Sequence, residues 1–296
     1  MKSTKPDTDL SRRAMLTTGL SAAAAVAVGT VAASSASAQS QTASKRFSNQ
    51  TVIITGATSG IGRVTAEAFA EEGANVFFCG RREALGAEVE AGIKAKGGKA
   101  TYIKADVRNK AELTRFIDAA AARTGTIDVA FNNAGIGQPF VDMASVSADN
   151  YTEMLATNLT GKYDAMVAEM PHMAEGGSII NTSSIFGVKA GANAVAYCAT
   201  MHAISGMTMG AALELAPKGI RVNAVAPGAI TDTDFMVPII GRRLNAEEVK
   251  QFGALHALGR TGSSSEVAKA VLFLASKDAS FLTGEIIKVD GYFLQG

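Results

Sequence analysis

The stretch TVIITGATSGIGRVTAEAFAEEG, residues 51–73, joins a strand, a glycine-rich turn and a helix without a break. Gly56 permits the tight turn, and Gly60 and Gly62 leave room for a pyrophosphate to reach the backbone N–H groups at the helix N-terminus. A glycine turn by itself is weak evidence, but the strand before it and the helix after it supply the context that dinucleotide binding requires. The stretch therefore predicts a dinucleotide site.

Apolar runs of strand length alternate with amphipathic stretches of helix length along the rest of the chain. Several runs are continuously apolar, as expected for strands covered on both faces. The expected strands are 51–55, 75–79, 100–104, 127–132, 177–183, 221–226 and 285–290, and the expected helices are 63–72, 110–123, 150–170, 197–216 and 265–275. This order predicts an α/β fold, a single Rossmann-type doubly wound parallel sheet flanked by helices, in one domain over residues 49–296.

The composition argues against several classes of protein. Of the 296 residues, 47% are apolar and 19% are charged, which indicates a packed core. The formal charge is +1 with both signs interspersed, so we expect no surface for nucleic acid. The two cysteines, Cys79 and Cys198, fall in an expected strand and an expected helix, and no Cys/His cluster has metal-ligand spacing. We therefore expect neither a disulfide nor a metal site.

Residues 1–38 have the pattern of an export signal. Paired arginines in SRRAML (11–16) precede a weakly apolar, alanine-rich run, and Ala36-Ser37-Ala38 provides the small residues that a signal peptidase requires. The segment resembles a bacterial twin-arginine signal that is cleaved after Ala38 and followed by a linker at 39–48. The alternative is an uncleaved membrane anchor, but Ser, Thr and Gly interrupt the run. We expect an exported, periplasmic protein without stable membrane insertion after cleavage.

More candidate cofactor residues follow the carboxyl ends of the expected strands, where dinucleotides lie in such sheets. Arg81 and Arg82 stand where an NAD-selective site holds an acidic residue, so they favour the 2′-phosphate of NADP over NAD. The alternative is a pair of solvated arginines that cap the next helix. Asp106 and Val107 follow the third strand, beside the expected adenine. NNAG (132–135) ends the fourth, where the nicotinamide ribose is expected to pass.

Several motifs occur in a fixed order over residues 48–296. They are TGATSGIG at 55–62, NNAG at 132–135, Ser184 thirteen residues before Tyr197, APG at 226–228 and VDG at 289–291. In this set the chain resembles the short-chain dehydrogenase/reductase family. The resemblance implies a homodimer or homotetramer that transfers hydride between a nicotinamide cofactor and a small-molecule alcohol or ketone. The predicted cofactor-binding residues are Thr55, Gly56, Ser59, Gly60, Ile61, Gly62, Arg81, Arg82, Asp106, Val107, Asn133, Ala134, Gly135, Tyr197, Pro227 and Gly228.

The resemblance also implies three catalytic residues. Ser184 matches the serine whose hydroxyl holds the substrate oxygen, and Tyr197 matches the acid/base that moves the proton. Asn158, in LATNLTG, matches the asparagine that orders a water in the proton relay. In a chain without this activity, Ser184 would cap a strand end and Asn158 would be a buried amide at a helix kink.

The family has a lysine four residues after the tyrosine, and this chain has Met201 there. In the family that lysine hydrogen-bonds the nicotinamide ribose and lowers the tyrosine pKa, and a drop of about three units corresponds to about 4 kcal/mol. Its loss should weaken alcohol oxidation most, because a protonated phenol still serves ketone reduction. Lys189, in the loop before Tyr197, is a candidate replacement, whereas His202 faces another side of the helix.

Two features after Gly228 bear on the site. Asp232 occupies the place of a family threonine that touches the carboxamide, and a shift of one residue to Thr231 or Thr233 would restore that contact. The apolar segment FMVPIIGRR (235–243) suits either a lid over an apolar substrate or a helix pair packed on the core.

Two functions are therefore open. The first is an NADP-dependent oxidoreductase that is weakened by Met201. The second is a nucleotide-binding protein of the same fold that has lost turnover and serves as a sensor or a partner subunit.

Overall fold

The computed structural model describes residues 45–294, so the predicted leader at 1–38 and most of the predicted linker lie outside the described residues. The packing begins within that linker, because Phe47 is 1% exposed and meets Phe69 edge to ring at a centroid distance of 4.8 Å. Among residues 45–294, no helix has the length and apolar character needed to cross a membrane.

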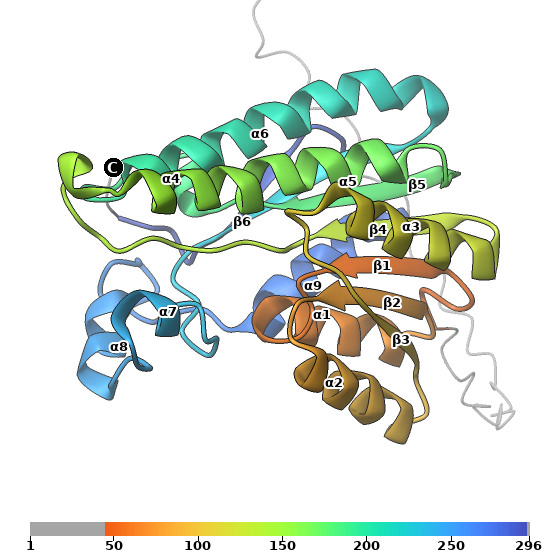
Figure 1. Ribbon diagram of the computed structural model, residues 1–296, viewed down its shortest axis with the longest axis horizontal. Helices are drawn as coiled ribbons and strands as arrows, with labels where there is room; N and C mark the ends of the chain where they lie inside the picture. Colours follow the sequence, from red (N-terminus) through yellow and green to blue (C-terminus); the bar gives the residue numbers. More distant parts are fainter. Residues whose placement is uncertain (1–44, 295–296) are drawn as a thin grey trace, which may run out of the picture. The chain divides into compact units, whose positions relative to one another are not determined.

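A parallel sheet of seven strands organises the described chain (Figure 1). The strands lie in the order β3-β2-β1-β4-β5-β6-β7, which reverses direction between β1 and β4. Sheets of this kind bind nucleotides at that reversal, beyond the carboxyl ends of the strands. The predicted doubly wound parallel sheet is confirmed. The strands are β1 (Thr51–Thr55), β2 (Asn75–Gly80), β3 (Lys99–Lys104), β4 (Ile127–Asn132), β5 (Met173–Thr182), β6 (Arg221–Pro227) and β7 (Ile286–Val289).

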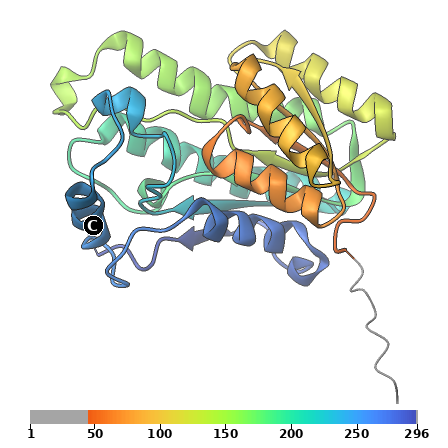
Figure 2. The same cartoon turned by 90° about the horizontal axis from the view of Figure 1, so that it is seen from below.

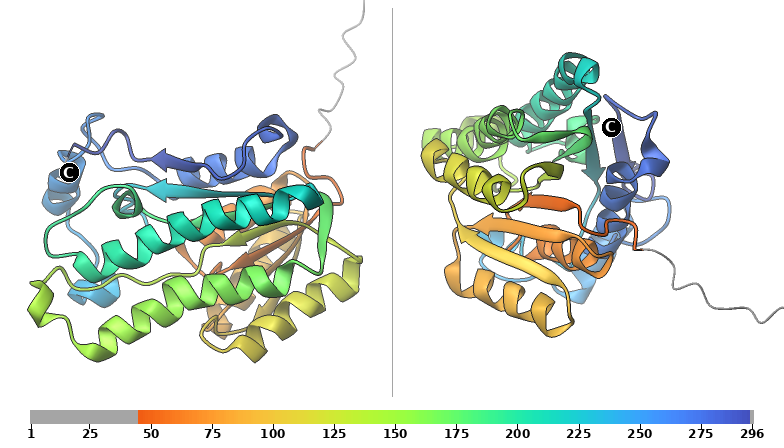
Figure 3. Two further views of the ribbon diagram at one scale, coloured as in Figure 1. Left: turned by 90° about the horizontal axis from the view of Figure 1, so that it is seen from above. Right: turned by 90° about the vertical axis from the view of Figure 1, so that its right-hand side faces the viewer.

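Helices cover both faces of the sheet. Figure 2 shows one layer, formed by α1 (Gly60–Glu71), α2 (Glu83–Ala95) and α9 (Ser264–Ala275). Figure 3 shows the other layer, formed by α3 (Lys110–Thr124), α4 (Ala148–Met154), α5 (Gly161–Glu169) and α6 (Val195–Leu215). The short helices α7 (Val237–Ile240) and α8 (Ala246–Gly253) lie beyond the carboxyl ends of the strands (Figure 1).

Alternation along β1 explains why the sheet has two cores. Val52 and Ile54 belong to the core under α1 and α9, whereas Ile53 belongs to the core under α3 and α5. Both faces of the strand are therefore buried, and a strand of this kind reads as an unbroken apolar run. Cys79 on β2 is likewise fully buried, and burial raises the pKa of its thiol to about 12.

The expected helices did not include α8 (Ala246–Gly253), and they differ from the observed ones in two further places. Helix α2 is missing from the expected set because glycines interrupt its pattern. Gly86 is required there, since a Cβ would lie 2.3 Å from the Tyr102 ring. The single helix expected at 150–170 contains a π-helical turn, Leu155–Thr160, between α4 and α5. Short 3₁₀ turns complete the fold at Met143–Ser145, Ile185–Gly187, Ala216–Lys218 and Lys277–Ala279.

Candidate active site

The glycine-rich turn after β1 packs against NNAG after β4. The Thr55 hydroxyl accepts hydrogen bonds from the backbone N–H groups of Asn133 and Ala134, at 3.1 and 3.2 Å. A Cβ at Gly56 would lie 2.7 Å from the Ala134 Cα, and one at Gly62 would lie 2.6 Å from the Asn133 amide nitrogen. These two glycines are therefore required by contact between the two segments, in addition to any contact with a pyrophosphate.

The N-terminus of α1 is open to an anion. Ser59 stands at the N-cap position, but its side chain makes no capping hydrogen bond. Gly60 has a φ of +55°, which an L side chain rarely adopts. Helix N-termini carry partial positive charge and unpaired N–H groups. The backbone from Ser59 to Gly62 therefore fits a pyrophosphate, as the sequence predicts.

Arg82 reaches across this turn. Its guanidinium donates to the Thr58 hydroxyl at 3.1 Å and also to the Ser59 hydroxyl. The neighbouring Arg81 is exposed, and Arg82 occupies the N-cap position of α2 without capping it through its side chain. Both predicted arginines are thus exposed, and Arg82 is the one that hydrogen-bonds to the glycine turn.

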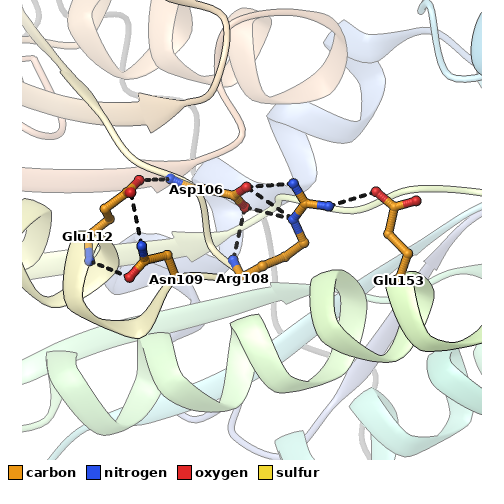
Figure 4. Close-up of polar contacts among 5 residues, drawn as sticks. All are labelled: Asp106, Arg108, Asn109, Glu112 and Glu153. Carbon is orange, nitrogen blue, oxygen red and sulfur yellow. Dashed lines mark hydrogen bonds and ion pairs between the residues drawn. The ribbon is translucent and has the colours of Figure 1, made fainter. Parts of the chain in front are cut away.

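Asp106, after β3, belongs to a polar cluster rather than lying free (Figure 4). Arg108 contacts Asp106 at 2.7 Å and Glu153 at 2.8 Å. Burial opposes ionisation of Asp106, but the hydrogen bonds from Arg108 outweigh it and hold the pKa of the carboxyl below its usual value. Val107 is buried, and a Cβ at Gly161 would lie 3.1 Å from it. The predicted adenine region is therefore built from a neutralised carboxylate and an apolar side chain.

The Ser184 side chain lies beside the Tyr197 hydroxyl, close enough to act on the pKa of the phenol. Ser184 follows β5 and is 8% exposed, and its hydroxyl accepts from the Phe186 N–H at 3.2 Å. Burial raises the pKa of Tyr197 to about 12, although Ser184 acts in the opposite direction. At neutral pH the phenol is therefore fully protonated, and it can donate a proton but scarcely accept one.

Apolar side chains surround this hydroxyl pair. The rings of Phe186 and Phe235 lie 6.5 and 6.2 Å from the Tyr197 ring, centroid to centroid. A Cβ at Gly137 would lie 2.7 Å from both Phe235 and Ile239. The predicted lid segment at 235–243 therefore packs over the tyrosine and includes the short helix α7.

Asn158 is fully buried in the π-helical turn. Its Oδ1 accepts from the Ile136 N–H at 2.8 Å, and its Nδ2 donates to the Ile136 carbonyl at 2.9 Å. The amide thereby fixes the strand extension that follows NNAG. An amide has a second N–H and a second lone pair beyond these two bonds, and the relay role predicted from the sequence would use them.

Met201 is 3% exposed on α6. Its backbone carbonyl accepts from the Ser183 and Ser205 hydroxyls, at 3.1 and 3.2 Å, so Ser183 anchors α6 while Ser184 faces Tyr197. Lys189 donates to the Phe293 carbonyl and lies 5.6 Å from the centroid of the Tyr292 ring.

Lys189 and His202, the two basic residues nearest to Tyr197 in the sequence, therefore bond to other groups. Lys189 is held by the C-terminal segment rather than swung toward the tyrosine. His202 is exposed, and its Nδ1 bonds to the Cys198 carbonyl, as the helical spacing predicts for a residue on another face.

The segment after β6 places Asp232 and Thr233 in different surroundings. The Asp232 carboxylate accepts from the Ser264 N–H at the start of α9, at 3.0 Å, so it faces away from the glycine turn. Thr233 instead lies beside that turn, since its methyl carbon is 3.3 Å from where a Gly60 Cβ would be. Pro227 ends β6, and the Gly228 N–H donates to the Val289 carbonyl at 3.0 Å.

Four buried residues near these segments are absent from the predicted site. Gln138 accepts from the Tyr197 N–H at 3.0 Å, and His256 accepts from the Ala229 N–H at 3.2 Å. Lys162 and Glu169 lie on the buried face of α5. Lys162 and Glu169 stand seven residues apart on one helix face, at positions where the helical pattern expects apolar side chains. That spacing was the sequence signal that could have identified them. The described residues contain no His, Cys, Asp or Glu group arranged to hold a metal ion.

Known proteins share this fold and much of this sequence. Residues 56–292 match the family model described as enoyl-(acyl carrier protein) reductase. The chain is 38% identical over 252 residues to a cyclohexanol dehydrogenase of Acinetobacter sp. (strain SE19), which covers 84% of this chain and 97% of that protein. It is 36% identical over 261 residues to a 7alpha-hydroxysteroid dehydrogenase of Clostridium sardiniense, covering 85% and 96%. A solved short-chain dehydrogenase/reductase from Serratia marcescens aligns at a TM-score of 0.78 with 29% identity, covering 84% of this chain and 99% of that one.

Proposed function

The chain belongs to the short-chain dehydrogenase/reductase family of NAD(P)-dependent oxidoreductases, and on that premise we propose that it reduces a small apolar ketone with NADPH. The observation that carries the proposal is the Ser184 side chain beside the Tyr197 hydroxyl, with the apolar ring of Phe235 next to the tyrosine ring. A bound nicotinamide supplies the hydride. The side chains of this chain hold the carbonyl oxygen and donate the proton to it.

The residues present fit a dinucleotide. The open N-terminus of α1, with Gly60 at positive φ, offers backbone N–H groups to the pyrophosphate. Asn133, Ala134 and Gly135 border the nicotinamide end, where their contacts with the glycine turn keep the backbone in one place.

The choice of NADPH over NADH rests on Arg82. Its guanidinium already lies among the hydroxyls of Thr58 and Ser59, where it would pair with a 2′-phosphate. Replacing Arg82 with Ala should raise the KM for NADPH at least tenfold and leave that for NADH nearly unchanged. Arg63→Ala on the exposed side of α1, where Arg63 pairs with Glu67, is the matched control. Equal effects on both cofactors would contradict the proposed contact.

Ser184 and Tyr197 act on the substrate oxygen. The Ser184 hydroxyl holds it by a hydrogen bond, and the Tyr197 phenol donates its proton as negative charge develops on that oxygen. We expect Phe235 and Ile239, which pack on Gly137, to shield the pair from water when a substrate is bound. Reduction is favoured because the raised pKa of Tyr197 keeps the acid form available.

An alicyclic ketone is the substrate class we propose. The rings of Phe186 and Phe235 place apolar surface beside Tyr197, and the two relatives named above act on cyclohexanol and on a hydroxysteroid by their names. A panel of cyclohexanone, a 7-oxosteroid and an acyclic ketone of similar size, assayed with NADPH, tests this. The acyclic ketone should be the poorest substrate by kcat/KM.

The second candidate function is a nucleotide-binding sensor or partner subunit, which the apolar side chain of Met201 in the active-site helix favours. The two functions differ in one measurement. The sensor would bind NADPH with micromolar or tighter affinity and yet reduce no ketone until Met201 is replaced with Lys.

We further propose a homo-oligomer outside the cytoplasm. Leu213 and Met209 on α6 and Tyr163 on α5 are 81%, 50% and 55% exposed, and such large apolar side chains on neighbouring helices suit contact with a second copy. Light scattering after gel filtration should give a dimer or tetramer, and Leu213→Arg should lower the measured oligomeric mass.

Cell fractionation of the full chain tests export through the predicted leader. Nicotinamide released on denaturing the periplasmic protein tests whether it carries its cofactor.

A further inference from the structure

Lys162 is a buried amine without an acidic partner. It lies on the inner face of α5 at 2% exposure, and its Nζ donates to the Ala134 carbonyl. Burial alone lowers the pKa of Lys162 to about 7, so no neighbouring carboxylate supports its charge. Asp164, two residues along the same helix, is bonded instead to Lys110 at 3.0 Å. A lysine is rarely kept in such a position for packing, because an apolar side chain would be more stable there.

The Lys162 amine contacts the NNAG segment and lies close to Asn158. A Cβ built on Gly135 would be 3.3 Å from the Asn158 Oδ1 and 3.8 Å from the Lys162 Nζ. Lys162 bonds to the residue before Gly135, and Asn158 bonds to the residue after it. Both side chains therefore hold consecutive peptides of the segment that lies at the nicotinamide end of the candidate site.

The same segment leads to Tyr197. Two residues beyond Ile136, the side chain of Gln138 accepts from the Tyr197 N–H at 3.0 Å. Helix α6, which carries Tyr197 and Met201, also packs on the π-helical turn that carries Asn158. Position 201 contributes only an apolar side chain to this region, while α5 contributes a buried amine to it.

We propose that Lys162 supplies from α5 the amine that position 201 lacks on α6, as a positioning residue that holds the Ala134–Ile136 segment and returns a proton to Tyr197. The proposal rests on the function proposed above. In reduction, the Tyr197 O–H bond breaks as the O–H bond of the alcohol forms. The Lys162 ammonium then gives up a proton through a water on Asn158, the phenol O–H is restored, and the neutral amine regains its proton from solvent.

Few other charged groups face Lys162. On α5 itself, Glu169 lies seven residues away, about 10 Å along the helix, and burial raises its pKa to about 8. From α3, Lys110 approaches but is paired with Asp164. The buried polar and apolar side chains of β4, β5 and α6 include the uncharged Asn132, Asn181 and Met201.

Moving the lysine back to α6 tests the proposal. Lys162→Met should lower kcat for ketone reduction by about 100-fold or more. The double variant Lys162→Met/Met201→Lys should recover kcat to within about tenfold of wild type. A purely structural lysine could not be replaced from another helix. Glu169→Gln, on the same buried face, is the matched control and should retain the activity.

Two further readouts separate the outcomes. The pH profile of wild-type kcat should bend near pH 7, and this bend should vanish in Lys162→Met. NADPH binding, followed by fluorescence, shows whether each variant still forms the cofactor site. If folded Lys162→Met binds NADPH and turns over like wild type, or if Met201→Lys restores nothing, the inference is overturned. If wild type neither binds NADPH nor reduces any ketone, the proposed function fails instead.

Discussion

The raised pKa of Tyr197 predicts that the two directions of the reaction respond differently to pH. With a pKa of about 12, the tyrosinate fraction at pH 7 is about 10⁻⁵, because the pH lies about five units below the pKa. Alcohol oxidation needs tyrosinate as the base, whereas ketone reduction needs the phenol. The oxidation kcat should therefore rise about tenfold per pH unit from pH 7 to pH 10, while this ionisation should leave the reduction kcat nearly flat between pH 8 and pH 10.

Replacing Met201 with Lys should change this difference. A cation near the hydroxyl lowers an acidic pKa by about one to three units. At pH 8 this would raise the tyrosinate fraction, and with it the oxidation kcat, by about 10- to 1000-fold. Reduction should change by less than about threefold, because at pH 8 the phenol remains at least half protonated even after a shift of three units or more.

Initial rates with cyclohexanol and NADP⁺, and with cyclohexanone and NADPH, followed at the nicotinamide absorbance, measure both directions. Tyr197→Phe is the control and should abolish both. A wild-type oxidation rate that is flat between pH 7 and pH 10 would refute the assigned pKa. Equal gains in both directions for Met201→Lys would refute the argument that the missing charge acts through the tyrosine.

Three other changes test the packing around the site. Lys162→Met should stabilise the protein by at most about 5 kcal/mol below pH 7, because the pKa of Lys162 is about 7 in the native state against 10.5 in the unfolded state. This gain in stability should shrink as the pH rises to 10.5, and urea unfolding at pH 6, 8 and 10 measures it. Glu169→Gln should show the opposite pH dependence. Because the pKa of the Glu169 carboxyl is raised to about 8, the wild-type protein loses stability as the pH rises from 4.5 to 8. The variant should therefore be more stable than wild type at pH 8 but not at pH 4.5. Gly62→Ala should destabilise by about 1–3 kcal/mol in thermal melts, because its Cβ would lie 2.5 Å from the Gly56 carbonyl oxygen, and an unchanged melting temperature would contradict that contact.

Much of the fold could be predicted because its signals are local. The apolar run before Gly56 and the helical period after Gly60 appear in adjacent residues, and β1 and α1 form where they were expected. Helix α2 escaped prediction because Gly86 serves a contact with Tyr102, which is not adjacent in sequence. The break at Leu155–Thr160 escaped for a similar reason, since a π-helical turn leaves no period of its own in so few residues.

The candidate site likewise has residues that the sequence could predict and others that it could not. Ser184, Tyr197 and the absence of a lysine at 201 could all be predicted, since they depend on spacing along the chain. Two details of the site depend on side-chain directions in loops. They are which of Arg81 and Arg82 reaches the glycine turn, and which threonine beside Asp232 lies next to that turn. Spacing does not specify those directions, and only the packed structure selects Arg82 and Thr233.

The sequence by itself determined a doubly wound sheet and predicted a dinucleotide turn and a serine–tyrosine pair, because each of these follows from residue periods and short spacings. The tertiary structure alone decided that burial raises the pKa of Tyr197 and that the amine of Lys162 is buried. Both depend on burial, which is a property of segments far apart in the chain that pack together. Lys162 is one lysine among many along the chain, and it is distinguished only when α5 closes over NNAG and removes it from water.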